Sequence, residues 1–267
     1  MRTRTLLQAL TALALVGACS AGGGAENDAP TDASTEQGAA EPEDQVSGTV
    51  TLYAAASLEA AFTDLIVEFE QQNPSISVEP PVYDGSSTLV TQLTEGADAD
   101  VFASAAEANM QDLVAEGLND GEPVLFATNT LVIAVPPGNP LGIEDLADLD
   151  GLDYVVCAPE VPCGAATQTL FEGAGTSVDA VSQEQNVTAV AERVARGEVD
   201  AGLVYATDIA TRSDVLEAVV PSNADEVVNR YPITTLVGAD EAASVFVDFV
   251  LSDDGQAVLE EYGFGRP

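Results

Sequence analysis

Apolar and polar residues follow two different periods along residues 49–267, and the two periods alternate. Short apolar runs such as TVTLYAAA (49–56) and TLVIAVPP (130–137) are followed by segments whose apolar residues lie three or four positions apart. The runs predict buried strands, and the wider spacing predicts amphipathic helices. After the first run, one helical face is marked by Leu58, Phe62, Leu65, Ile66 and Phe69, before a stop at Asn73-Pro74.

The remaining elements are predicted in the same way. Strands are expected at ISVEPPVY (76–83, broken or ended by its prolines), DVFAS (100–104), YVVCAP (154–159) and AGLVYAT (201–207). Helices are expected from Ser86 to Gly96, after the strand DVFAS as far as about Gly117, from Asn186 to Arg196, and within 243–264. This α/β alternation predicts parallel sheets with helices on both faces. Such sheets bind ligands at the carboxyl ends of their strands, beside helix N-termini.

Uncharged hydrogen-bond donors stand where several predicted strands end. Ser57 follows the first strand, where it either caps the next helix or lies beside free first-turn amides that bind an anion. The other junctions hold Ser86-Ser87, Cys163-Gly164, Asn186-Val187 and Tyr205. Each has an ordinary alternative as a cap, a turn or a core residue. Because none of these positions is Arg or Lys, the set suits a fully deprotonated oxyanion, which only accepts hydrogen bonds.

Composition narrows the choice of function. The 267-residue chain has 45 acidic residues, seven arginines, no His and no Lys, and a formal net charge of -38. Nucleic acid is a poor partner, because binding to phosphates needs basic patches. A secreted hydrolase using Ser57 or Ser86 is disfavoured, since neither a Ser-His triad nor a Ser-Lys dyad is possible. A glycosidase would need a convergent acidic pair, and none is identifiable.

The first 48 residues predict a targeting segment and a tether. Arg2 and Arg4 precede an apolar run that is too short to span a bilayer but fits a signal-peptide core, so 1–18 is expected to be a signal peptide. The run ends in LVGAC, which resembles the lipobox of bacterial lipoproteins, with Cys19 lipidated; the alternative is an ordinary secretory signal. Residues 19–48 would then be the lipidated cysteine and a disordered acidic tether.

Five motifs connect the rest of the chain to a family. AAASL, GSSTL, ADVFAS, VPCG and GLVYATD occur in the order and at about the spacing found in the molybdate-binding proteins of bacterial ABC importers. The resemblance covers essentially all of 49–267, including RYPI and the terminal YGF. It implies a two-lobe α/β fold of the periplasmic-binding-protein type (type II), with the ligand in the interlobe cleft. It also implies a non-enzymatic protein without a cofactor that passes molybdate, and tungstate too, to a membrane permease.

The same resemblance implies a set of ligand residues. Ser57 and Ser86 would bind molybdate by hydroxyl and amide, Cys163 and Val187 by amide, and Tyr205 by hydroxyl. Ser57 would then cap its helix and present that helix to the anion. Many relatives have Ala where Cys163 stands, which an amide contact tolerates. The segment SAAEANM lacks the acidic and aromatic residues that often follow the serine in relatives, so the pocket rim is expected to differ.

The resemblance also sets the expected organisation. Lobe 1 would take 49–127 plus 232–267, and lobe 2 would take 128–231, so that donors before and after TLVIAVPP face each other across one cleft; one continuous sheet is not expected. We expect a monomer on the outer face of the cell membrane. Two alternatives keep the same fold with another ligand. Sulfate could be excluded only by the size of the pocket. Phosphate carries a proton at neutral pH and favours a site with a hydrogen-bond acceptor, which we do not identify in the sequence.

The remaining cysteines and acids suggest no metal site. With Cys19 assigned to lipid, Cys157 and Cys163 form an even pair in an oxidising compartment. A disulfide between them would hold the amides of 162–164 in place; the alternative is two buried thiols, and a metal is disfavoured without His. In DLDGLDY, an EF-hand register from Asp148 puts the wrong residues at its fifth and sixth positions, so a turn is favoured. Asp208 is interpreted as a helix cap.

Overall fold

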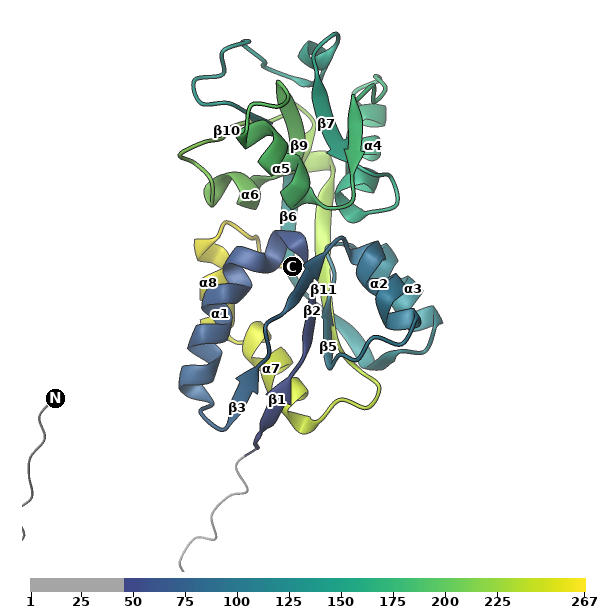
Figure 1. Cartoon of the computed structure of the whole chain (residues 1–267), viewed down its shortest axis with the longest axis vertical. Helices are drawn as coiled ribbons and strands as arrows, with labels where there is room; N and C mark the ends of the chain where they lie inside the picture. The colour runs from purple at the N-terminus through teal and green to yellow at the C-terminus, as the bar shows by residue number, and fades with distance from the viewer. Residues whose placement is uncertain (1–45) are drawn as a thin grey trace, which may run out of the picture. The chain divides into compact units, whose positions relative to one another are not determined.

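The structure is a computed structural model that describes residues 46–267 (Figure 1). The predicted signal peptide, Cys19 and most of the tether lie outside the described residues. The strands are β1 (Gly48–Val50), β2 (Leu52–Ala55), β3 (Ile76–Val78), β4 (Val82–Asp84), β5 (Val101–Ala103), β6 (Asn119–Val135), β7 (Tyr154–Cys157), β8 (Ser182–Glu184), β9 (Ala201–Tyr205), β10 (Glu217–Val219) and β11 (Val228–Leu236). Within 46–267, no helix combines the length and the apolar character that a bilayer crossing needs.

The helices follow the strands as the apolar periods predict. They are α1 (Glu59–Gln72), α2 (Ser86–Thr94), α3 (Glu107–Ala115), α4 (Pro162–Gly173), α5 (Val187–Ala195), α6 (Ala206–Ala210), α7 (Glu241–Leu251) and α8 (Asp253–Glu261). Short 3₁₀ turns are η1 (Ala56–Leu58), η2 (Leu146–Leu149) and η3 (Ala224–Glu226). The strand predicted at 76–83 is two strands, because Pro80 and Pro81 interrupt the ladder.

The main sheet has the strand order β4-β2-β5-β11-β6-β9-β7-β8, with β10 paired to β6. The outer strands on each side are parallel, as predicted. The centre is antiparallel, because β6 and β11 run in opposite directions. The hydrogen-bond ladder is therefore continuous, which contradicts the expectation of separate sheets. Its continuity depends on the 17 residues of β6, which pair with β11 first and with β9 and β10 at the end.

The hydrophobic residues form separate cores at the two ends of β6. Phe62 and Phe246 belong to a core of β1, β2, β5, α1, α7 and α8, beside a smaller core under α2 and α3; together we call this part lobe 1. Tyr154 and Val190 belong to a core of β6, β7, β9, α4 and α5, which we call lobe 2. Figure 1 shows β6 and β11 as the paired strands that run from one lobe to the other.

The start of α4 packs tightly against the end of β7. A Cβ on Gly164 would lie 1.8 Å from the Ala158 carbonyl oxygen, so only glycine permits this approach. Pro162 stands in the first turn of α4, where its missing N–H leaves no bond unmade. A disulfide joins Cys157, the last residue of β7, to Cys163, with their Cα atoms 5.6 Å apart. These constraints fix the first turn of α4 relative to the sheet.

Replacing both cysteines, Cys157→Ala with Cys163→Ala, should lower the free energy of unfolding by about 2 kcal/mol, because the unfolded chain regains the entropy of a short closed loop. Urea unfolding monitored by circular dichroism measures this. A reductant should destabilise the wild type to a similar extent and leave the double variant unchanged. Equal stability of wild type and variant would show that the bridge does not stabilise the fold.

Candidate functional site

A small cavity lies between the two lobes, at the ends of several strands. Its lining consists of Ala55, Ala56, Ser57, Asp84, Gly85, Ser86 and Ala105 from lobe 1, and Pro162, Cys163, Asn186, Val187 and Tyr205 from lobe 2. All of the predicted ligand residues are therefore brought together. The volume of this cavity is about 10 Å³, enough for about one water molecule.

A larger depression of about 560 Å³ also adjoins Ser57. It is lined by Glu59, Asp64, Glu192 and Asp208, with Arg212 as its basic residue. This surplus of carboxylates repels an anion. On chemical grounds the small cavity, and not the larger depression, is the candidate anion site.

Helices α2, α4 and α5 begin at the cavity. Ser86 and Val187 are the first residues of α2 and α5, and Cys163 is the second residue of α4. The first amides of a helix have no carbonyl of their own helix to bond and carry the positive end of its dipole. In α5, the Asn186 side chain accepts a hydrogen bond from Ala189 N at 3.0 Å, as predicted for a cap, and leaves the Val187 amide to another acceptor.

The Ser86 hydroxyl is oriented by the backbone. Ser86 is fully buried, and its Oγ accepts a hydrogen bond from Ala105 N at 3.0 Å. Since a backbone N–H can only donate, the proton of Ser86 is left for a different acceptor. The hydroxyl therefore offers a donor at the cavity.

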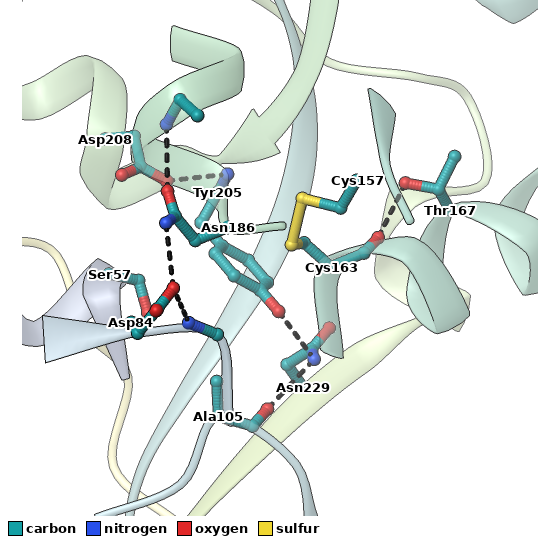
Figure 2. Close-up of a disulfide and its surroundings, with 12 residues drawn as sticks. Ser57, Asp84, Ala105, Cys157, Cys163, Thr167, Asn186, Tyr205, Asp208 and Asn229 are labelled. Carbon is teal, nitrogen blue, oxygen red and sulfur yellow. Dashed lines mark hydrogen bonds between the residues drawn. A yellow bond between two sulfur atoms is a disulfide. The ribbon is translucent and has the colours of Figure 1, made fainter. Parts of the chain in front are cut away.

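Tyr205 offers a second donor from lobe 2. It is 1% exposed, and its burial raises the pKa of the phenol well above the usual value, so the hydroxyl stays protonated. Asn229 Nδ2 donates to the Tyr205 hydroxyl oxygen at 2.9 Å (Figure 2). The proton of Tyr205 is therefore left for another acceptor, and the neighbouring Tyr231 hydroxyl competes with a ligand for it.

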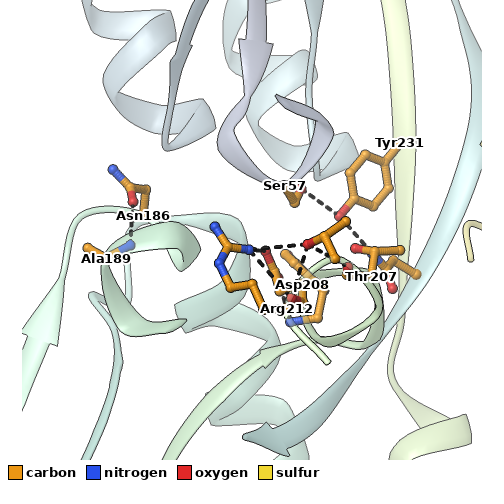
Figure 3. A network of polar contacts seen from close by, with 10 residues as sticks. Ser57, Asn186, Ala189, Thr207, Asp208, Arg212 and Tyr231 are labelled. Atoms are coloured by element: carbon orange, nitrogen blue, oxygen red, sulfur yellow. Dashed lines mark hydrogen bonds and ion pairs between the residues drawn. The ribbon is translucent and has the colours of Figure 1, made fainter. Parts of the chain in front are cut away.

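The prediction that Ser57 caps its helix is wrong. Ser57 lies inside η1, α1 begins only at Glu59, and neither helix has a side-chain cap. The Ser57 Oγ instead lies 3.0 Å from the Tyr231 hydroxyl on β11 (Figure 3). Burial raises the pKa of Tyr231, which keeps this partner protonated. The inserted 3₁₀ turn redirects the side chain away from the first turn of α1, while Ser57 still lines the cavity.

Sequence reasoning missed a carboxylate at the cavity. Asp84 Oδ1 accepts hydrogen bonds from Gly85 N at 2.7 Å and from Asn186 Nδ2 at 3.0 Å (Figure 2). The second bond joins lobe 1 to lobe 2 directly. The expectation that the site has no acceptor is therefore wrong. The signal was present in YDGSSTL, where an acid ends a strand just before the serines.

Within residues 46–267, no arginine lines the cavity. Arg193 pairs with Glu184, Arg212 with Asp208, and Arg230 with Glu107. Neutral hydroxyls and helix amides are therefore the donors that face the cavity. The candidate positions contain no Arg or Lys, and the same is true of the other described residues that line the cavity.

Asp208 supports the turn that carries Tyr205. Its carboxylate accepts a hydrogen bond from Tyr205 N at 3.0 Å. Tyr205 is the N-cap of α6 and Asp208 its third residue, so Asp208 supports the helix start through a capping box and not as the N-cap itself. Asp208 is buried, and desolvation raises its pKa from 3.8 to about 7. Arg212, 3.8 Å away, and the Tyr205 amide only partly offset this rise (Figure 3).

Two α/β lobes joined by paired strands, with a cavity of neutral donors between them, define a two-lobed solute-binding protein. The family comparison agrees with this class. The chain belongs to the bacterial extracellular solute-binding protein family, whose model matches residues 50–265.

Individual relatives make the comparison more specific. The molybdate-binding protein ModA of Mycobacterium tuberculosis H37Rv is 42% identical over 222 residues, covering 82% of this chain and 85% of that protein. Homology to molybdate-binding proteins is thereby confirmed. Two solved structures share the fold: the periplasmic molybdate-binding protein of Azotobacter vinelandii (18% identity, TM-score 0.70, 82% of this chain and 99% of that chain) and the sulfate-binding protein SubI of M. tuberculosis (20%, 0.71, 82% and 86%). The predicted two-lobe binding-protein fold is confirmed, and these relatives are named as binding proteins.

Gly85 marks a close approach between the lobes and gives a test of closure. A Cβ there would lie 2.3 Å from the Gln185 carbonyl oxygen and 3.0 Å from Val161 Cγ1, both in lobe 2. The Gly85 φ of -60° suits alanine, so Gly85→Ala should fold normally. It should hold the lobes apart and weaken binding of molybdate, the probe, by about ten-fold or more.

Calorimetry with molybdate measures this effect, and X-ray scattering reports lobe separation. Gly173→Ala is the matched control, because it meets only the Asn223 side chain, at 3.1 Å, and lines no part of the cavity. Gly85→Ala with wild-type affinity would rule out the close approach as a requirement for binding.

Asp208 should make stability depend on pH. Because the pKa of Asp208 is raised in the folded state, the folded protein holds this proton more tightly than the unfolded chain does. The resulting stabilisation of the fold is complete below about pH 4 and is lost as pH rises through about 7. Asp208→Asn keeps an acceptor for Tyr205 N but does not ionise. The variant should therefore gain stability relative to wild type from pH 4.5 to pH 8, as measured by urea unfolding. A difference that does not change with pH would contradict the raised pKa.

Proposed function

We propose that this protein captures molybdate, and also tungstate, outside the cytoplasm and delivers it to the membrane permease of an ABC importer. The observation that carries the proposal is the convergence of Ser57, Ser86, Cys163, Val187 and Tyr205, from both lobes, on one cavity. The 42% identity to a protein named as molybdate-binding supports the choice of ion.

The donor chemistry supports a fully deprotonated oxyanion. All four oxygens of such an ion only accept hydrogen bonds. The hydroxyls of Ser86 and Tyr205 each accept a bond from a framework N–H and so have a proton to donate to the ion. The first-turn amides of Cys163 and Val187 complete the set from lobe 2, with their helix dipoles favouring negative charge.

Asp84 favours a second candidate, a protonated oxyanion such as hydrogen phosphate. Its carboxylate lines the cavity and can accept the proton that such an ion carries. However, Asp84 Oδ1 already accepts bonds from Gly85 N and Asn186 Nδ2, and this holds the carboxylate toward the lobe contact. Sulfate, like molybdate, carries no proton at neutral pH, so a site of this kind can distinguish the two ions only by their size.

The proposal includes a location and a mode of attachment. The apolar run before Cys19 and the small residues that end it favour a lipoprotein anchored to the outer face of the cell membrane. The acidic tether would let the binding unit reach its permease. We propose that the protein acts as a monomer, without cofactor or catalytic residue.

Calorimetry of the purified protein with molybdate, tungstate, sulfate and phosphate in turn tests the proposal. Molybdate and tungstate should bind much more tightly than sulfate, and phosphate should not bind measurably. Tighter binding of sulfate would make this a sulfate carrier of the same fold. Tighter binding of phosphate would assign Asp84 as the acceptor of the ligand proton.

Ser57→Ala, Ser86→Ala and Tyr205→Phe should each weaken molybdate binding by about 1.5–3 kcal/mol, because each removes a hydrogen bond to a charged ligand. Ser87→Ala is the matched control. Ser87 is the next residue of α2, it does not line the cavity, and its Oγ has no hydrogen-bond partner within 46–267. Affinities of the three variants within error of wild type would show that these hydroxyls are not ligands.

A further inference from the structure

Two buried asparagines face each other on the strands that join the lobes. Asn129 on β6 and Asn229 on β11 are register partners. They are 5% and 8% exposed. Asparagine is unfavourable in strands, and a buried amide is costly unless it is hydrogen-bonded. The contacts of these side chains therefore require an explanation.

The orientation of the Asn229 amide is fixed by lobe 1. Its nitrogen lies 3.0 Å from the Ala105 carbonyl oxygen, and a carbonyl can only accept, so the NH₂ group must face it. The same NH₂ group lies 2.9 Å from the hydroxyl oxygen of Tyr205 in lobe 2 (Figure 2). Asn229 thus donates to both lobes at once, and the Tyr205 oxygen is the acceptor.

The other end of the Asn229 amide argues against a purely stabilising role. Its Oδ1 is buried and has no hydrogen-bond partner within residues 46–267. A buried acceptor without a partner destabilises the folded state. The Asn129 amide, by contrast, is used at both ends, because its Oδ1 accepts from Thr130 N and its Nδ2 donates to Thr207 Oγ1.

We propose that Asn229 is a positioning residue that makes the Tyr205 hydroxyl a donor to the bound oxyanion. With its oxygen accepting from Asn229, Tyr205 has its single proton left to donate, and an oxyanion in the cavity that it lines is a stronger acceptor for this proton than the neutral Tyr231 hydroxyl. Through the same NH₂ group, Asn229 holds Ala105, whose own N–H orients the Ser86 hydroxyl. One side chain on β11 therefore contacts a backbone group of lobe 1 as well as the phenol of lobe 2. This inference rests on the proposed function.

A double-mutant cycle on molybdate affinity tests this role. Asn229→Leu, of similar size but without a donor, should weaken binding by about ten-fold or more in the wild-type background. In the Tyr205→Phe background, where no hydroxyl is left to orient, the same substitution should cost less than about three-fold. Equal fold-losses in the two backgrounds, or no loss in the wild type, would overturn the proposal.

Asn129→Leu is the matched control, because it removes the partner asparagine without touching Tyr205. Its fold-loss should be the same in the wild-type and Tyr205→Phe backgrounds. Thermal unfolding of each variant checks folding, and Asn229→Ala, put through the same cycle, replaces Asn229→Leu if that variant does not fold. If the wild type binds sulfate but not molybdate, the proposed function fails, while the cycle run with sulfate still supports or overturns the role of Asn229.

Discussion

The pairing of β6 with β11 is the contact on which the rest of the structure depends. Strand β6 contributes residues to both hydrophobic cores and β11 to the core of lobe 1, so the two lobes are joined by a hydrogen-bonded ladder and not by a flexible linker. Helices that start at strand ends in each lobe then face one another beside this ladder. The same pairing places Asn229 against Ala105 and Tyr205, which line the cavity. The paired strands thus also support Tyr205, one of the hydroxyls that we propose as ligands.

A chain with a formal charge of -38 has no arginine among the described residues that line the candidate anion site. Surface carboxylates act over about a Debye length, ~10 Å at 0.1 M salt, whereas hydroxyls and helix amides act only at contact. The two effects therefore operate at different distances. Burial strengthens the contacts in the cavity, while salt weakens the repulsion from the surface. Arg193, Arg212 and Arg230 are each paired with a carboxylate and do not line the cavity.

The sequence allowed most of the outer parallel strands to be predicted, together with the five candidate residues, because four of these residues follow a short apolar strand and Val187 follows the helix cap Asn186. Strand β8 was missed because its residues, Ser182–Glu184, are polar, and the cavity residue Asp84 was missed as well. The centre of the sheet was missed, since Gly121, Pro123 and Asn129 break the apolar pattern in the first half of β6. The wrong cap at Ser57 has a local cause, because apolar spacing does not distinguish a 3₁₀ turn from the start of an α-helix. The role of Asn229 depends on contacts with Ala105 and Tyr205 that are distant in sequence, and no local pattern encodes them.

The position of the donors couples binding to closure. Ser86 belongs to lobe 1, whereas Cys163 and Val187 belong to lobe 2, so an ion in an open cleft meets only part of its shell. A ligand shifts a conformational equilibrium only by its difference in affinity for the two states, and here that difference is the second half of the donor set. The direct bond between Asp84 and Asn186 adds on the order of 1–3 kcal/mol at most, since the carboxylate would otherwise be hydrated. Under the proposed function, the ion itself would therefore supply much of the driving force for closure. The absence of a side chain at Gly85 allows the two backbones to come close enough for donors of both lobes to contact one ion.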